Sequence, residues 1–205
     1  MNDAPLLEVA PVSRRTPRLP GYAGFWRRLL ASSIDGLVFL LPAAAMGWWA
    51  LSSRTAAALL LIPGSACWHF YRVVMHAHRG QTVGKVVTRI RVVTMSGLRI
   101  SWREALLRDS ISIVFTALAT TSTLIAVTLM PEAAWGLGWR ETARMLDGAE
   151  PSWGPWAKAA GALWLWIDLL ALLVNRQRRT LHDLIAGTGV ICIPRDVNRP
   201  PPRVA

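Results

Sequence analysis

Residues 24–51, GFWRRLLASSIDGLVFLLPAAAMGWWAL, decide the fold class of this chain. The stretch opens with Trp26, Arg27 and Arg28, continues with a long apolar run and closes on two tryptophans. A helix rises about 1.5 Å per residue, so about 20 apolar residues cross the ~30 Å hydrocarbon layer of a bilayer. Arginines at one end and tryptophans at both ends are typical interfacial anchors. We therefore predict a transmembrane helix with one acid, Asp35, inside it.

The composition of the whole chain also indicates a membrane protein. It is 53% hydrophobic and 17% charged, whereas soluble domains are about 25% charged. Eleven of the seventeen aromatic residues are tryptophans, which fits interfacial belts. The net charge is +11, but the arginines lie in blocks beside apolar spans and no nucleic-acid recognition motif accompanies them. We therefore expect anionic lipid headgroups as partners, and no nucleic acid.

The chain divides into a basic, proline-bearing leader at 1–20, a transmembrane domain at 21–195 and a tail at 196–205. We expect the leader and the tail to be disordered. The first apolar run is longer than a signal-peptide core and is followed by further spans, so we expect it to act as an uncleaved insertion signal. The predicted fold is all-α, a four-helix transmembrane bundle with spans at about 28–50, 55–76, 104–130 and 156–174.

A basic polar stretch at 79–103 separates the second span from the third. Apolar and arginine residues alternate at 88–92 and alternate again at 98–101, on either side of a Ser-Gly pair at 96–97. Two alternating runs around a glycine turn predict a β-hairpin. We expect this small hairpin between helices 2 and 3 to lie on the cytoplasmic membrane surface. Its lipid-facing basic residues would be Lys85, Arg89, Arg91 and Arg99.

Lysine and arginine predict the topology. Nineteen of them lie in the leader, the central stretch and the carboxyl-terminal segment, and four lie in the two loops on the opposite side. By the positive-inside rule, both termini and the hairpin are cytoplasmic. The second of the opposite loops carries tryptophans and both signs of charge, and residues 134–146 could form a short interfacial helix there.

Charged residues enter three of the predicted spans at a similar depth. Asp35 and Asp168 lie about seven residues from the cytoplasmic ends of their spans, and Arg108 and Asp109 lie about five or six residues in. At about 1.5 Å per residue, these side chains lie roughly 8–11 Å below the cytoplasmic interface. Buried charges are tolerated when they are paired. We therefore predict one buried polar cluster made of Asp35, Arg108, Asp109 and Asp168, with Arg28 nearer the surface.

Two patterns resemble ligand sites but do not fulfil their requirements. In GQTVGK, residues 80–85, three residues separate the glycines and Val86 follows the lysine. A phosphate loop has four residues there and Ser or Thr after the lysine, so we reject nucleotide binding. His69, His76 and His78 have no cysteine or acid beside them in the sequence. We interpret them as interfacial histidines and expect no metal and no cofactor.

Four motifs together resemble the RDD family of bacterial membrane proteins. They are GFWRRLLASSID (24–35), GQTVGKVVTRIRVV (80–93), SWREALLRD (101–109) and TLHDLIAGTGVI (180–191). The family is named after one arginine and two aspartates, and the resemblance places them at Arg28, Asp35 and Asp183. It implies a multi-pass protein of the bacterial cytoplasmic (inner) membrane, with a largely unassigned molecular function. Asp183 would cap a helix end, pair with Arg28 or act in function.

Two functions remain open at this point. The first is transport of an ion or small solute, with the buried acids binding a cation or proton. Four helices make a small pathway, which a homo-oligomer would enlarge. The second is a non-catalytic module for membrane assembly, lipid binding or signalling, in which the buried charges are structural. We do not expect an enzyme, because the sequence has no Ser-His-Asp, HExxH or CxxC arrangement. The sequence specifies no cargo.

Overall fold

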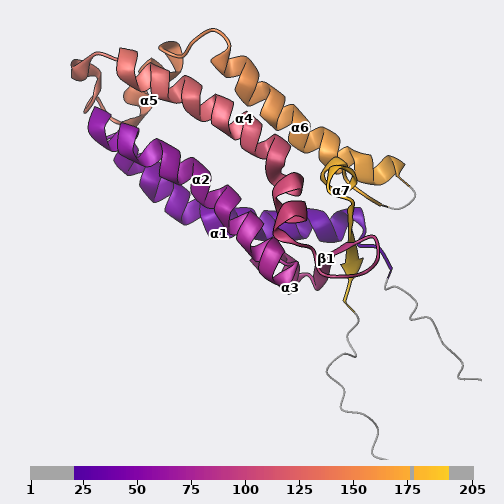
Figure 1. The fold of residues 1–205 in the computed structure, drawn as a ribbon. Coiled ribbons are helices and arrows are strands. Elements are labelled where there is room, and N and C mark those ends of the chain that lie inside the picture. Colours follow the sequence, from indigo (N-terminus) through magenta and orange to yellow (C-terminus); the bar gives the residue numbers. More distant parts are fainter. Residues whose placement is uncertain (1–20, 176–177, 194–205) are drawn as a thin grey trace, which may run out of the picture.

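The computed structural model describes residues 21–175 and 178–193 (Figure 1). The leader and tail predicted at 1–20 and 196–205 lie outside these ranges. Four described helices have the length and composition to cross a bilayer, as predicted, and they indicate a multi-pass membrane protein. These helices are α1 (Phe25–Ala50), α2 (Arg54–Arg79), α4 (Trp102–Leu129) and α6 (Gly154–Val174).

The four long helices pack in chain order, α1 on α2, α2 on α4 and α4 on α6. Their outer surfaces carry large apolar side chains, for example Leu41 and Val174, which are 79% and 88% exposed. In a soluble domain such exposure would be costly, but hydrocarbon solvates these side chains in a bilayer. The polar backbone groups bond within each helix, which the bilayer requires.

Four short elements gather at one end of the bundle, where α1 and α4 begin and α2 and α6 end (Figure 1). They are helices α3 (Val83–Val87) and α7 (Leu181–Ile185) and strands β1 (Ile90–Thr94) and β2 (Thr188–Cys192). The two strands pair antiparallel, and Val92 lies opposite Val190. The core beneath this end consists of Ala23, Ala31, Val73, Ile90, Val92, Ile100, Ala105 and Val190.

The strand partner differs from the prediction of a hairpin between helices 2 and 3. β1 pairs with β2, about a hundred residues later, and residues 98–101 form no strand. A tight turn does follow β1, because Thr94 N–H bonds to the Leu98 carbonyl and Gly97 has a φ of 81°. The alternation at 98–101 has another cause, which is the burial of Ile100 in the same core as Ile90. Burial of a single residue produced the pattern that resembled a second strand.

The two short helix–strand units follow one plan. Each begins with an N-cap threonine, Thr82 or Thr180, and continues as a five-residue helix. Each then passes a residue with left-handed backbone, Arg89 or Gly187, into its strand. The paired Val92 and Val190 both lie ten residues after their threonine. Each unit also follows two spanning helices, α1 and α2 or α4 and α6, so the order of these elements is repeated along the chain.

The opposite end of the bundle holds the loop between α4 and α6. It contains a short 3-10 helix, η1 (Glu132–Ala134), and helix α5 (Trp139–Gly148). The helix considered at 134–146 therefore begins later, after Gly138, whose φ of 94° does not fit a helix. Glu150 joins this loop to two spans, because its carboxylate accepts hydrogen bonds from Thr123 Oγ1 at 2.8 Å and Lys158 Nζ at 2.5 Å.

Candidate functional site

Arg28 and Asp183 form a buried ion pair at the sheet end. Arg28 Nη1 lies 2.5 Å from Asp183 Oδ2, although 155 residues separate the two in the chain. The same guanidinium donates from Nη2 to the Arg178 carbonyl at 2.6 Å. Arg108 of α4 approaches the other oxygen of Asp183 and donates to Thr188 Oγ1 at 2.6 Å. One carboxylate therefore joins α1, α4, α7 and β2.

Asp183 is fully buried, and its charge is compensated on several sides. Its carboxylate accepts from Thr180 N–H while its own N–H bonds to Thr180 Oγ1, which forms a capping box at the start of α7. Burial by itself raises the pKa of Asp183, but the charges and hydrogen bonds of Arg108 and Arg28 outweigh it and hold that pKa well below its ordinary value. Asp183 is thus ionised at neutral pH. It serves both structural roles expected of it, capping and pairing.

Asp35 holds the start of α3 against α1. Its carboxylate accepts hydrogen bonds from Thr82 Oγ1 at 2.5 Å, Gly84 N–H at 2.8 Å and the Tyr71 hydroxyl at 2.9 Å. The Tyr71 oxygen in turn accepts from Val83 N–H at 2.8 Å. A spanning helix thus supplies the anion that satisfies the first N–H groups of a short helix. Because its lone pairs are used in this way, Asp35 acts here as a cap contributed by another element.

The segment GQTVGK at 80–85 is explained by the same contact. A Cβ atom on Gly84 would lie 2.0 Å from the Ala31 carbonyl oxygen and 3.1 Å from Asp35 Cγ. Only glycine permits α3 to approach α1 so closely. Gly80 ends α2 with left-handed backbone, at a φ of 66°. The two glycines serve chain reversal and close packing rather than phosphate binding.

The first of two histidine–carboxylate pairs lies between α2 and α4. His69 Nδ1 is 2.5 Å from Asp109 Oδ2, and His69 Nε2 is 2.9 Å from Thr116 Oγ1. Arg72 Nη1 lies 3.0 Å from the other oxygen of Asp109. His69 and Asp109 are both buried. The imidazole therefore bridges a carboxylate and a hydroxyl that belong to the same helix, α4.

The second pair lies between α6 and α7. Asp168 Oδ1 accepts the backbone N–H of His182 at 2.9 Å and lies 2.6 Å from His182 Nδ1. His182 Nε2 lies 3.1 Å from Ser112 Oγ, again on α4. Asp168 caps α7 as Asp35 caps α3, although Asp35 lies on the first spanning helix of its unit and Asp168 lies on the second. Each histidine–carboxylate pair therefore has one imidazole, one buried carboxylate and one α4 hydroxyl.

One face of α4 connects the two pairs. Asp109, Ser112 and Thr116 are spaced three and four residues apart, so they lie on one side of the helix, facing His69 and His182. Groups on such a face lie about 5–6 Å from one another along the helix. α4 thus brings both imidazoles to neighbouring positions at the sheet end of the bundle.

The predicted polar residues are distributed among separate contacts. Asp35 contacts α3, Asp109 contacts His69, and Asp168 contacts His182. Arg108 pairs with Asp183 rather than with any of these three carboxylates. The four predicted residues therefore do not form a single hydrogen-bonded cluster.

The histidines are the buried polar residues whose placement the sequence analysis predicted least well. His69 and His76 are buried, contrary to the interfacial placement expected for them, while His78 is exposed. His69 lies seven residues, about two turns, before His76 and so shares its inward face. The sequence signal for this burial was the recurrence of histidine on one face of the helix. The histidines do not have the spacing that is typical of metal ligands.

The four basic residues predicted to form a lipid-facing hairpin differ in their position and in their contacts. Lys85 belongs to α3 and is half-buried, with Nζ 3.4 Å from Thr82 Oγ1. Arg91 of β1 bonds to Gln81 Oε1. Arg89 and Arg99 are exposed, one before β1 and one beyond the turn that follows it. They do not form one face of a hairpin.

Comparison with known proteins yields a family match. No curated protein and no solved structure matches the chain. The model of the RDD family matches residues 22–187. That range includes Arg28, Asp35 and Asp183, the three residues assigned to the family name. The chain therefore belongs to the RDD family.

Proposed function

We propose that this protein moves protons, or an ion or small solute coupled to protons, across the bacterial inner membrane. The two histidine–carboxylate pairs, His69–Asp109 and His182–Asp168, are the proton-handling groups in this proposal. The observation that carries it is that each imidazole has one ring nitrogen within 2.6 Å of a buried carboxylate oxygen and the other within 3.1 Å of a hydroxyl of α4. Chains of Asp and His inside a bilayer commonly form proton paths.

The chemistry of imidazole suits this role. One ring nitrogen can accept a proton while the other releases one, and the neighbouring carboxylate stabilises the protonated ring. Asp109 and Asp168 would hold each ring in position, and Thr116 and Ser112 would pass a proton along α4. Basic residues concentrate in the segments that meet at the sheet end of the bundle. We therefore place both pairs near the cytoplasmic face, with both termini cytoplasmic.

The duplicated architecture supports a transport role. Many transporters consist of two repeats with the same orientation, related by an axis along the membrane normal. Here α1–α2–α3–β1 and α4–α6–α7–β2 have the same order of elements, and their strands pair with Val92 opposite Val190. A homo-oligomer would provide a wider pathway than four helices can.

Flux through the purified protein tests the proposal. Proteoliposomes with an internal pH dye are given a proton gradient and a panel of Na⁺, K⁺ and Li⁺ gradients. We expect flux in the wild type and its loss in His69→Gln and His182→Gln, with helix content and elution volume unchanged. His78→Gln makes the same chemical change at an exposed histidine and should retain flux. Equal flux in all four proteins would refute the assignment.

A second candidate is a non-catalytic membrane module for assembly, lipid binding or signalling. It is favoured by the satisfied contacts of Asp35 and Asp183, which give these acids structural roles. In this case anionic lipid or a protein would contact Arg89 and Arg99 at the exposed surface. Absence of flux for every cation, together with loss of stability in both histidine variants, would favour this candidate. Neither candidate requires catalysis or a cofactor.

A further inference from the structure

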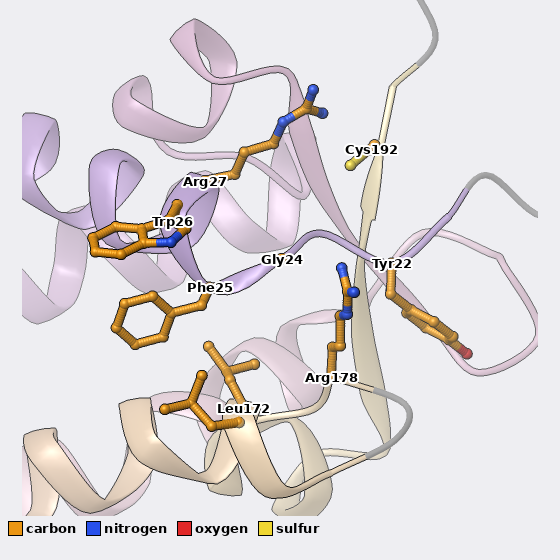
Figure 2. A pocket seen from close by; sticks show the side chains of 9 residues that line it. Tyr22, Gly24, Phe25, Trp26, Arg27, Leu172, Arg178 and Cys192 are labelled. Atoms are coloured by element: carbon orange, nitrogen blue, oxygen red, sulfur yellow. The ribbon is translucent and has the colours of Figure 1, made fainter.

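A groove opens at the sheet end of the bundle, between the start of α1 and the end of α6 (Figure 2). Its volume is about 590 Å³. Apolar side chains line one side of the groove and arginine side chains line the other. In Figure 2 the Phe25 and Leu172 side chains lie toward the helices, while the heads of Arg27 and Arg178 lie toward β2.

The apolar side consists of residues at the ends of two spanning helices. Phe25 and Trp26 begin α1 and stack edge to face, with ring centroids 5.2 Å apart. Leu172 and Leu173 lie in the last turn of α6. Trp26 is 77% exposed and Leu173 is 64% exposed. Such surfaces lie where acyl chains meet headgroups, since tryptophan concentrates at that level.

The charged side consists of two guanidinium groups. Arg27 and Arg178 are exposed, and neither guanidinium has a hydrogen bond or ion pair with any residue of 21–175 or 178–193. Among the described residues, no acidic side chain lines the groove. Gly24 leaves room for Arg178, because a Cβ atom there would lie 3.2 Å from Arg178 Nη1. Two uncompensated cations beside an apolar surface are complementary to an anionic amphiphile.

We propose that this groove binds an anionic phospholipid. The headgroup phosphate contacts Arg27 and Arg178, because guanidinium binds phosphate through paired hydrogen bonds. The part of an acyl chain nearest the headgroup lies against Phe25, Trp26 and Leu173. This site is distinct from the histidine–carboxylate pairs, and it does not depend on whether the protein conducts protons. The occupant would connect α1 to α6 beside the Arg28–Asp183 ion pair.

Native mass spectrometry of the purified protein tests this site. The wild type is titrated with phosphatidylglycerol or phosphatidylcholine, and the number of retained lipids is counted. We expect retention of phosphatidylglycerol and an affinity loss of at least about tenfold in the double variant Arg27→Gln/Arg178→Gln, because each cation near a lipid surface contributes about fivefold. The matched control is Arg79→Gln/Arg103→Gln. Arg103 follows Trp102 at the start of α4 as Arg27 follows Trp26 in α1, and both control residues are exposed.

A thiol reporter gives an independent measurement. Cys192 lines the groove and Cys67 is exposed on α2, so a Cys67→Ser background leaves Cys192 as the reporter. Phosphatidylglycerol should slow alkylation of Cys192 in this background, and inorganic phosphate should not. Unchanged phosphatidylglycerol retention in the double variant would overturn the proposal. Equal protection by inorganic phosphate would also overturn it, since the site would then bind a free anion.

Discussion

The contact between α3 and α1 leads to a sharp prediction for Gly84→Ala. The new Cβ would lie 2.0 Å from the Ala31 carbonyl oxygen, whereas real Cβ atoms essentially never approach other heavy atoms within 3.0 Å. This oxygen belongs to the helix backbone, so it cannot move aside as the end of a flexible side chain could. α3 must therefore move by about 1 Å. That shift would lengthen the 2.8 Å bond from Gly84 N–H to Asp35 to about 3.8 Å, which is beyond hydrogen-bonding range.

The expected loss of stability is the sum of three contributions. Overpacking costs about 1–3 kcal/mol, and loss of a hydrogen bond to a charged group costs about 1.5–3 kcal/mol. Alanine recovers about 1 kcal/mol, because it favours helix more than glycine does. Gly84→Ala should therefore lower the free energy of unfolding by about 2–5 kcal/mol.

The matched control is Gly36→Ala, in α1 next to Asp35. A Cβ atom there would have no neighbour within 4 Å, so the substitution should be neutral or stabilise by up to about 1 kcal/mol. Both variants and the wild type are unfolded in mixed micelles by titration with sodium dodecyl sulfate, and tryptophan fluorescence is recorded. If Gly84→Ala proved as stable as Gly36→Ala, α3 would not lie against α1 as described, and Asp35 could not act as its cap.

Three further predictions concern stability. Asp183→Asn removes the carboxylate that Arg28 and Arg108 share and should cost about 3–5 kcal/mol in the same titration. Because the folded-state pKa of Asp183 is lowered, its contribution is complete above about pH 4 and is lost as pH falls through that lower pKa, so the wild type should lose stability there more steeply than the variant. Burial, together with the charges of Arg108 and Arg72, lowers the pKa of Lys85 to about 7. The unfolded chain keeps this proton up to about pH 10, so the unfolding temperature should rise from pH 7 to pH 10 in the wild type, and Lys85→Met should flatten that rise. Gly154→Ala places a Cβ atom 1.9 Å from Ser122 Oγ at the far end of the bundle and should cost about 1–3 kcal/mol. Adding Ser122→Ala should recover part of that loss, and Gly148→Ala, with open space at its Cβ, should show none.

The spans and the depth of their charges could be predicted because both depend on local sequence. A run of apolar residues long enough to cross a bilayer must form a helix there, whatever it packs against. Distance along that helix then gives the depth of Asp35 and Asp168. The family resemblance added Asp183, which lies outside any span and is marked locally only by the Thr-x-x-Asp pattern of a capping box.

The contacts of these charges could not be predicted, because they join distant parts of the chain. His69 and Asp109 are 40 residues apart, and Arg28 and Asp183 are 155 apart. Depth alone allowed one common cluster, whereas helix rotation directs each carboxylate to a different neighbour. The similar pattern of TVGKVVTRIRVV (82–93) and TLHDLIAGTGVI (180–191) was the available sign of two equivalent units.

The sequence by itself determined that this chain has four helices long and apolar enough to cross a membrane, with acids near their basic ends, because hydropathy and helical rise are properties of consecutive residues. Only the tertiary structure decided that β1 pairs with β2, that Asp35 and Asp168 cap α3 and α7, and that α4 contacts both imidazoles. Those outcomes depend on the order and rotation of the packed helices, which consecutive residues do not specify.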